Sequence, residues 1–343
     1  MRVAIVGFGV AGAARLTAYR QVPQAEVVAV VDPSAERRAQ ASALDPRLRT
    51  LPTLADALDG AALAAVDVVD ICAPPAFHAP LAEQAMSAGC HVLCEKPVGL
   101  DVRETERMVG CSRRTGRLLY PVYNYVYSPM MKVLTQAADG WLDRPLKARF
   151  EIRRTTHAVG TPGWQPDWRR DRGVAGGGIL LDHGTHCVYM ATRLLGGQPE
   201  QVACTTGPGP ATASSDDDDG RSVEESVSAR LDFAGGTCEI ELSWACDERR
   251  NRYSVVGGNG SVLIDDDTFV VETAAGVERG TLRSPTASGT HEEWFPELFA
   301  DFIRHVEQPG RWSDPLDQIL STARIIEAAY TSAADAGRPL RMR

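Results

Sequence analysis

An acid and an imidazole stand four residues apart at the end of the stretch GGGILLDHGTH, which runs from Gly176 to His186. Side chains at i and i+4 share one face of a helix, so Asp182 and His186 are predicted to point to the same side. The imidazole can exchange a proton at neutral pH, and the carboxylate can accept hydrogen bonds from substrate hydroxyl groups. The preceding glycines are expected to let the backbone pass close to a bound molecule. From these residues alone, an N-capping aspartate and a core histidine remain the alternative.

A lysine in the stretch AGCHVLCEKP (88–97) is the second group that could do chemistry. Lys96 comes just past the C-terminal end of a predicted parallel strand, where open α/β sheets bind their ligands. Pro97 disfavours helical geometry at Lys96 and predicts an extended bend there. An ammonium group in this place can donate to a reacting oxygen and stabilise its developing charge. An ordinary surface lysine is the alternative.

Glycines at the start of the chain predict a dinucleotide site. GFGVAG (7–12) fits the pattern G-x-G-x-x-G, follows a predicted strand and opens a helix. The glycines permit a tight turn and a close approach of the backbone to a pyrophosphate at the helix N-terminus. Asp32 ends the second predicted strand, where a carboxylate accepts from a ribose hydroxyl and favours NAD. Arg37 leaves NADP open, because its guanidinium can fold back over a 2′-phosphate.

The sequence pattern changes near residue 122, which predicts two domains to carry these residues. Up to residue 122, short apolar runs alternate with helical patterns, which predicts a parallel sheet covered by helices on both faces. From residue 123 on, alternating patterns such as TCEIELSW (237–244) predict a large open, mostly antiparallel sheet. Helical periodicity returns at 317–335. We therefore predict an α/β protein with a Rossmann domain at 1–122 and an α/β domain for substrate binding and oligomerisation at 123–343.

Composition narrows the class of partner. The chain has 343 residues and a formal net charge of −9, which argues against nucleic acid or an anionic membrane as the main partner. Its N-terminal apolar run is broken by glycines and is not expected to be a signal peptide. The eight cysteines are scattered, as reduced thiols in a cytoplasmic protein would be.

Metal binding is not expected. Asp182, His183, His186 and Cys187 are zinc ligands by type, but on a helix His183 and Cys187 would point away from the other two. The aspartate-rich tract 206–220 lacks the spacing of a calcium loop and is expected to be a solvated loop.

The ordered motifs GFGVAG with Asp32, APPAFH (73–78), AGCHVLCEKP and GGGILLDHGTH resemble the glucose–fructose oxidoreductase, inositol dehydrogenase and rhizopine catabolism protein family. The likeness covers nearly the whole chain. It implies a Rossmann domain, an oligomerising open sheet, and Lys96, Asp182 and His186 as catalytic residues. The resemblance and the motifs together give the expected cofactor contacts: Gly7, Phe8, Gly9, Val10, Gly12, Asp32, Arg37, Ala73, Pro74, His78, Glu95 and Lys96. The expected substrate contacts are Tyr123, Asn124, His157, Trp168, Arg169, Asp182 and His186.

The predicted function is hydride transfer between nicotinamide and a secondary hydroxyl, or the corresponding ketone, of a sugar, cyclitol or related polyol. In the oxidative direction His186 takes the hydroxyl proton, Lys96 stabilises the alkoxide, and Asp182 accepts from a neighbouring hydroxyl. Two other functions of the same fold remain open, a redox-assisted glycoside hydrolase and a non-catalytic NAD-sensing regulator. The apolar strand residues of 146–270 outnumber what one helix layer covers, which predicts a homodimer or homotetramer through the sheet.

Overall fold

The computed structural model describes residues 1–59, 66–161, 164–207, 223–282 and 291–342. Contacts divide the chain into two compact units, here called the N-terminal and C-terminal units. The N-terminal unit comprises residues 1–124, 160–168 and 292–320, and the C-terminal unit comprises 125–159, 169–291 and 321–343. Most of the aspartate-rich tract expected as a loop, residues 208–220, lies outside the described residues.

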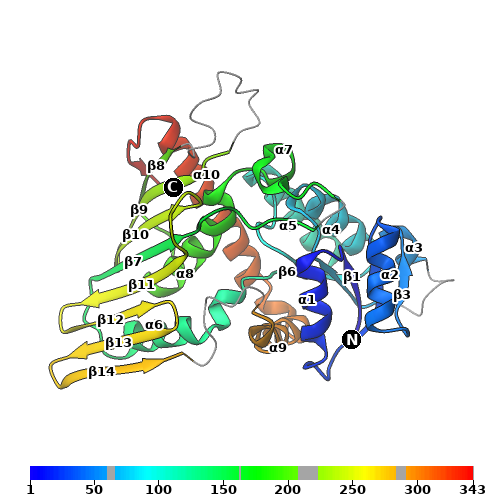
Figure 1. The fold of residues 1–343 in the computed structure, drawn as a ribbon, viewed down its shortest axis with the longest axis horizontal. Helices are drawn as coiled ribbons and strands as arrows, with labels where there is room; N and C mark the ends of the chain where they lie inside the picture. The colour runs from blue at the N-terminus through cyan, green and yellow to red at the C-terminus, as the bar shows by residue number, and fades with distance from the viewer. Residues whose placement is uncertain (60–65, 162–163, 208–222, 283–290, 343) are drawn as a thin grey trace. The chain divides into compact units, whose positions relative to one another are not determined.

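A six-stranded parallel sheet forms the core of the N-terminal unit (Figure 1). Its strands are β1 (Arg2–Val6), β2 (Glu26–Val31), β3 (Arg49–Leu51), β4 (Val68–Ile71), β5 (His91–Cys94) and β6 (Leu119–Pro121). The strand order is β3-β2-β1-β4-β5-β6, so the direction of winding reverses between β1 and β4. In sheets of this topology a crevice opens at that reversal, beyond the carboxyl ends of the strands.

Helices fill the connections of this sheet. They are α1 (Val10–Tyr19), α2 (Ala35–Leu44), α3 (Leu54–Leu58), α4 (His78–Ser87) and α5 (Val102–Thr115), with α9 (Phe295–Glu307) added from late in the sequence. Ser34, Thr53 and Asp101 cap three of them by accepting from backbone N–H groups in the first turn. The strands are buried Val, Ile and Ala runs, as expected for a parallel sheet with both faces covered.

A nine-stranded sheet forms the C-terminal unit, in the order β14-β13-β12-β11-β7-β10-β9-β8-β15. Its strands are β7 (Leu146–Arg153), β8 (Gln201–Gly207), β9 (Ser226–Phe233), β10 (Gly236–Ser243), β11 (Arg250–Gly257), β12 (Gly260–Asp265), β13 (Thr268–Thr273), β14 (Gly276–Thr281) and β15 (Leu340–Arg341). Within this sheet, only β7 and β10 pair in parallel among the described strands, so it is mixed but mostly antiparallel. The predicted fold class is therefore confirmed.

Helices pack on one face of this sheet. They are α6 (Pro129–Gly140) and α8 (Thr185–Leu195), and the short α7 (Arg172–Ala175) precedes α8. The long helix α10 (Ser313–Ala334) replaces the helix predicted at 317–335, and its residues are divided between the units.

The inner strands β7, β9 and β10 of the large sheet alternate between buried and more exposed side chains. Phe150 and Ile152 on β7 and Ile240 on β10 are buried, whereas Arg149 and Glu239 between them form an ion pair in solvent. The period of two therefore buries the apolar residues of these inner strands. Toward the β14 edge of the sheet, apolar side chains stay accessible, since Val256 on β11 is 43% exposed and Val277 on β14 is 51% exposed. The assembly through the sheet stays a prediction.

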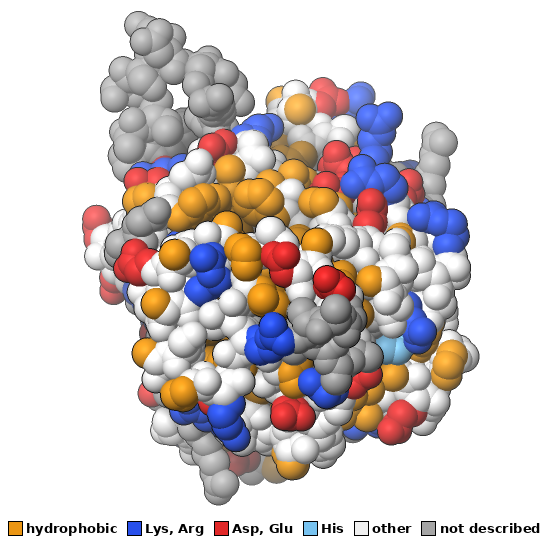
Figure 2. Space-filling model, turned by 90° about the vertical axis from the view of Figure 1, so that its right-hand side faces the viewer, with side chains coloured by type: hydrophobic (Ala, Val, Ile, Leu, Met, Phe, Trp, Pro, Cys, Tyr) orange, Lys and Arg blue, Asp and Glu red, His pale blue; other side chains and the backbone are white. Residues whose placement is uncertain are grey.

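No described helix is long and apolar enough to cross a membrane. On the face shown in Figure 2, the described Lys and Arg side chains are intermixed with Asp and Glu. A surface of this kind offers no extended basic patch there to a polyanion.

Candidate active site

The glycine-rich turn between β1 and α1 is built around close backbone contacts. Gly7 has φ +89°, and a Cβ on it would lie 2.7 Å from the backbone nitrogen of Ala73. A Cβ on Gly12 would lie 2.0 Å from the carbonyl oxygen of Gly7. Gly9 is different, because the nearest atom to a Cβ there, in Thr161, is 4.0 Å away. The first and third glycines therefore close the turn, and the middle one leaves space above the uncapped N-terminus of α1, as a pyrophosphate needs.

Asp32 follows β2 at the same edge of the sheet and is buried. Its Oδ2 accepts from the Phe8 backbone N–H at 2.8 Å, and its Oδ1 accepts from the Ser34 N–H at 2.8 Å. The guanidinium of Arg37 lies 3.7 Å from Oδ2 and also donates to Thr161. The carboxylate thus ties the glycine turn to the β2–α2 loop, a role that the sequence did not predict. Arg37 lies where it can meet the ribose end of a dinucleotide, which keeps the question of NADP open.

The loop after β4 carries Ala73 and Pro74 and runs against Gly7. The His78 ring beyond it is fully buried and contacts two backbone carbonyl oxygens, that of Pro97 at 2.8 Å through Nδ1 and that of Ala73 at 2.7 Å through Nε2. Burial lowers the pKa of His78, while these two backbone hydrogen bonds raise it. Through these contacts His78 connects two loops of the N-terminal unit, and the cofactor contact expected of it stays a prediction.

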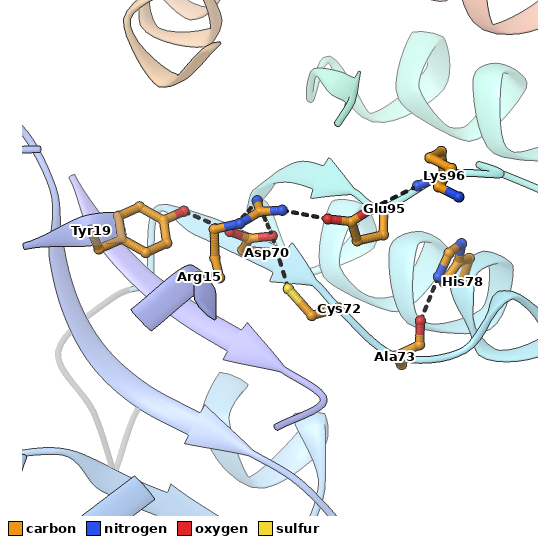
Figure 3. Close-up of polar contacts among 8 residues, drawn as sticks. All are labelled: Arg15, Tyr19, Asp70, Cys72, Ala73, His78, Glu95 and Lys96. Carbon is orange, nitrogen blue, oxygen red and sulfur yellow. Dashed lines mark hydrogen bonds and ion pairs between the residues drawn. The ribbon is translucent and has the colours of Figure 1, made fainter. Parts of the chain in front are cut away.

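A buried ionic network stands behind Lys96 (Figure 3). Arg15 on α1 donates from Nη1 to both oxygens of Asp70, at 3.1 and 3.0 Å, and from Nη2 to Oε1 of Glu95 at 2.5 Å. The second oxygen of Glu95 accepts from the Lys96 backbone N–H at 3.3 Å. Burial lowers the pKa of Arg15, but the surrounding acidic groups, Asp70 foremost, outweigh it and raise the pKa above its usual value.

Tyr19 and Cys72 complete this network. The Tyr19 hydroxyl donates to Asp70 at 2.9 Å, and the Cys72 thiol lies 3.6 Å from the same carboxylate. Burial, and next the charge of Asp70, raises the pKa of both groups well above its usual range. Both groups therefore stay neutral and serve as donors. Arg15 in turn fixes the carboxylate of Glu95, which precedes Lys96 in the turn. The Lys96–Pro97 peptide bond of that turn is cis.

The remaining predicted residues of the N-terminal unit are Tyr123, Asn124 and Trp168. Tyr123 is buried and Asn124 is half-buried, directly after β6. Trp168 comes from the segment 160–168 and packs against Gly160, where a Cβ would meet its ring at 2.9 Å. Arg169, its neighbour, belongs to the C-terminal unit.

In the C-terminal unit, Gly176, Gly177 and Gly178 are each required by a different structural constraint. Gly176 takes φ +83° and ends α7. A Cβ on Gly177 would lie 2.1 Å from the Tyr330 hydroxyl, and one on Gly178 would lie 2.0 Å from the Glu224 carbonyl oxygen. Within this unit the glycines make room for the chain itself, whereas the sequence suggested room for a ligand.

Glu224 has a structural role at the site that the sequence did not reveal. One carboxylate oxygen, Oε1, accepts from the backbone N–H groups of Gly178 at 2.9 Å and Leu180 at 3.0 Å, and from the Tyr330 hydroxyl at 2.8 Å. Its carbonyl oxygen accepts from Ile179. It therefore caps the start of the helical segment from a distant part of the sequence, and it fixes the segment that carries Asp182 and His186.

The segment itself begins with a π-helical turn (η4, Leu180–Gly184) that continues into α8. Single π turns in proteins are frequent at functional sites. Asp182 on this turn lies 3.5 Å from the Arg169 guanidinium and 3.4 Å from the His183 ring. Of the predicted substrate residues, Arg169 and Asp182 are thus brought together.

His186 occupies the first turn of α8 and is almost fully buried. Its Nδ1 lies 2.5 Å from the Tyr189 hydroxyl, and the Tyr125 ring packs on the imidazole with 4.5 Å between ring centroids. Neither tyrosine was predicted for the site, although Tyr189 has helical spacing, i+3, from His186. His157 is buried against Trp244, with ring centroids 5.9 Å apart.

The predicted cofactor residues thus gather at the carboxyl edge of the parallel sheet, and the acid–imidazole pair stands on one helical segment of the other unit. Lys96 belongs to the N-terminal unit, and Asp182 and His186 belong to the C-terminal unit. The described residues contain no cluster of three or more metal-ligating side chains.

Comparisons with known proteins agree with this arrangement. Residues 1–123 match the family described as an oxidoreductase family with an NAD-binding Rossmann fold, and residues 131–263 match the GFO/IDH/MocA C-terminal domain. The chain is 31% identical to 1,5-anhydro-D-fructose reductase of Ensifer adhaerens, over 69% of this chain and 68% of that protein. It is 32% identical to D-glucoside 3-dehydrogenase of Escherichia coli (strain K12), over 57% of this chain and 54% of that protein.

A solved structure also resembles the whole chain. The crystal structure of GenD2 from gentamicin A biosynthesis, in complex with NAD, is 25% identical with a TM-score of 0.81. The match covers 100% of this chain and 96% of that one.

Proposed function

The chain belongs to the GFO/IDH/MocA family of NAD-binding oxidoreductases, and from this premise we propose that it transfers a hydride between nicotinamide and a secondary hydroxyl of a sugar, cyclitol or related polyol. Membership confirms the predicted family, the oxidoreductase class and the nicotinamide cofactor. The observation that carries the proposal is that the glycine turn, Asp32 and Lys96 share the carboxyl edge of one parallel sheet. A cofactor bound along that edge would reach Lys96 with its reactive end.

The protein side of the reaction follows from three side chains. We assign to Lys96 the stabilisation of negative charge on the reacting oxygen, and to His186 the removal of its proton during oxidation. Asp182 accepts a hydrogen bond from a neighbouring hydroxyl, and Arg169 beside it limits its orientation. NAD, when bound, supplies the hydride acceptor.

The residues present fit that cofactor. The space above Gly9, the uncapped N-terminus of α1 and the carboxylate of Asp32 are the features that a pyrophosphate and an adenosine ribose require. We propose NAD as the preferred form, with Gly7 to Gly12 and Asp32 holding it and NADP as a weaker alternative through Arg37.

A direct assay tests this function. Purified protein is mixed with NAD or NADP and a panel of sugars and cyclitols, and reduced nicotinamide is followed by its absorbance near 340 nm. Lys96→Ala should lower turnover by roughly 10²- to 10⁴-fold, the cost of losing a positioned donor, and should leave NAD affinity nearly unchanged. Wild-type turnover in Lys96→Ala would overturn the assigned role.

We further propose a homodimer or homotetramer formed through the nine-stranded sheet. The support is the open face of that sheet, where paired groups such as Arg149 with Glu239 (3.2 Å) and Ser228 with Glu241 (2.9 Å) offer a polar surface to a second copy. Light scattering at micromolar concentration tests it, and a monomer would overturn it.

The division into a cofactor domain at 1–122 and a substrate-binding and oligomerisation domain at 123–343 is part of the same proposal. So is a cytoplasmic location, which the eight free thiols support.

A further inference from the structure

The imidazole of His186 has a fixed partner on its own helix. Tyr189 follows it by three residues, so that both side chains lie on one face of α8. His186 Nδ1 and the Tyr189 hydroxyl oxygen lie 2.5 Å apart, within hydrogen-bond distance. Tyr189 is completely buried, so this partner does not exchange freely with water.

Tyr125 fixes the other side of the pair. Its backbone N–H donates to the Tyr189 hydroxyl oxygen at 3.3 Å, and its ring lies against the imidazole at an angle of 47°. The hydroxyl oxygen of Tyr189 therefore accepts one hydrogen bond from the backbone already. The imidazole of His186 is thus contacted by the Tyr189 hydroxyl at Nδ1 and by the ring of Tyr125.

Proton bookkeeping then separates two arrangements. A neutral imidazole carries one N–H, and the other ring nitrogen is the acceptor. To take a proton from a substrate hydroxyl at Nε2 while Nδ1 keeps its partner, His186 must carry its own proton on Nδ1. In that tautomer Nδ1–H donates to Tyr189, whose oxygen accepts from both His186 and the Tyr125 N–H. The opposite arrangement, with the phenol donating to Nδ1, places the proton on Nε2 and disables the base.

We propose that Tyr189 is a positioning residue that holds His186 in the Nδ1–H tautomer and supports the imidazolium formed during turnover. The inference rests on the proposed role of His186 as general base. In the oxidative step the O–H bond of the substrate breaks and its proton goes to Nε2. NAD, when bound, would supply the acceptor for the hydride that leaves the carbon, so that the C–O bond becomes a carbonyl. The Nδ1–H donor becomes cationic at that moment, so its hydrogen bond to Tyr189 strengthens when it is needed.

The charged and titratable groups near the His186–Tyr189 pair are not altered by the substitution Tyr189→Phe. Tyr125 is close enough to Arg154, Arg249 and Asp182 to feel their charges, although burial dominates and raises its pKa. His291 packs edge-on against the Tyr125 ring, with 5.5 Å between ring centroids. A phenol-to-phenyl change at Tyr189 removes one hydrogen-bonding group and alters none of these charges.

Nitrogen NMR of the histidine rings tests the tautomer without any substrate. The protein, saturated with NAD, is labelled with ¹⁵N-histidine, and the His186 signals are identified by their loss in His186→Asn. We expect a protonated Nδ1 in the wild type at a pH where the ring is neutral, and a shift toward protonated Nε2 in Tyr189→Phe. Protonated Nε2 in the wild type would overturn the proposal.

Kinetics with the best substrate of the sugar and cyclitol panel tests the consequence. Tyr189→Phe should lower kcat by about 10- to 100-fold, the range of one lost hydrogen bond to a charged group, with KM for NAD unchanged. The Tyr189 oxygen, as an acceptor, stabilises the cationic form of the His186 ring, and its loss should lower the pKa of that ring. The pH midpoint at which the oxidative rate rises should therefore move to lower pH. Loss of stability alone would not move that midpoint.

A matched control and a separate variant complete the design. Tyr253→Phe removes another fully buried hydroxyl of the same unit and should leave kcat and the pH midpoint unchanged. If His186→Asn abolishes turnover while Tyr189→Phe matches the wild type in rate and midpoint, the role of Tyr189 is wrong and the proposed function stands. If His186→Asn keeps wild-type turnover, the general-base role itself fails.

Discussion

The ionic network behind Lys96 makes a quantitative prediction for Arg15→Met. The guanidinium is buried between Asp70, which has no exposed surface, and Glu95, and it also lies 4.4 Å from the centre of the Phe295 ring. Methionine fills much of the same space but leaves the Asp70 charge with only neutral donors. Removal of one partner from a buried ion pair costs about 3–5 kcal/mol, mostly because the remaining charge is stranded. Loss of the cation–π contact adds to this by up to about 2 kcal/mol.

Denaturant unfolding, followed by the fluorescence and the circular dichroism of the protein, measures this cost. The matched control is Arg107→Met, which breaks ion pairs to Glu83 (2.9 Å) and to Glu104 (4.0 Å) at a mostly exposed arginine. These pairs are screened by water, so their loss should change stability by about 1 kcal/mol or less.

A double variant separates stranded charge from lost packing. Arg15→Met combined with Asp70→Asn removes both the guanidinium and the charge that it neutralises, and Asn keeps an acceptor for Tyr19. It should be more stable than Arg15→Met alone by at least about 1–2 kcal/mol, because the buried charge is gone. A cost of less than about 1 kcal/mol for Arg15→Met, or a double variant less stable than the single one, would refute this reasoning.

Three shorter predictions concern other parts of the chain. Asp32→Ala should narrow the preference for NAD over NADP, measured as the ratio of their dissociation constants by calorimetry; an unchanged ratio would contradict the assignment. Gly178→Ala should destabilise the protein by about 1–3 kcal/mol or more and lower kcat, because its Cβ would lie 2.0 Å from a backbone oxygen of Glu224. The control Gly140→Ala, which has open space, should be neutral or slightly stabilising in the same unfolding assay. Burial, and after it the charge of Arg117, lowers the pKa of His91, whose Nδ1 accepts a backbone N–H at 3.0 Å, so the unfolded chain binds the proton first as the pH falls. Stability should therefore drop below about pH 6.5, by at most about 1.4 kcal/mol per pH unit from this group, and His91→Asn should reduce the drop in unfolding curves at pH 7.5 and 5.5.

Local patterns in the sequence were enough for the architecture, the family and the nicotinamide cofactor. A buried parallel strand is a continuous apolar run, and a dinucleotide turn needs glycines at fixed offsets, so both are written in neighbouring residues. The order of motifs identified the family, because each motif carries its own spacing. The sequence also showed the i, i+4 spacing of Asp182 and His186, but it did not predict the π-helical turn at Leu180–Gly184.

Contacts between distant segments were decided only by the tertiary structure. Glu224 caps the helical segment from 44 residues away in sequence, and Asp70 meets Arg15 across 55 residues. Gly177 and Gly178 are required by close contacts with Tyr330 and Glu224, which the sequence alone did not indicate. His78 was expected to face the cofactor, but both of its ring nitrogens contact carbonyl oxygens of the chain. The type of a side chain determines which hydrogen bonds it can make, but the packing of the chain determines which partner it meets. Burial then fixes that partner, because an unsatisfied polar group inside the protein is costly.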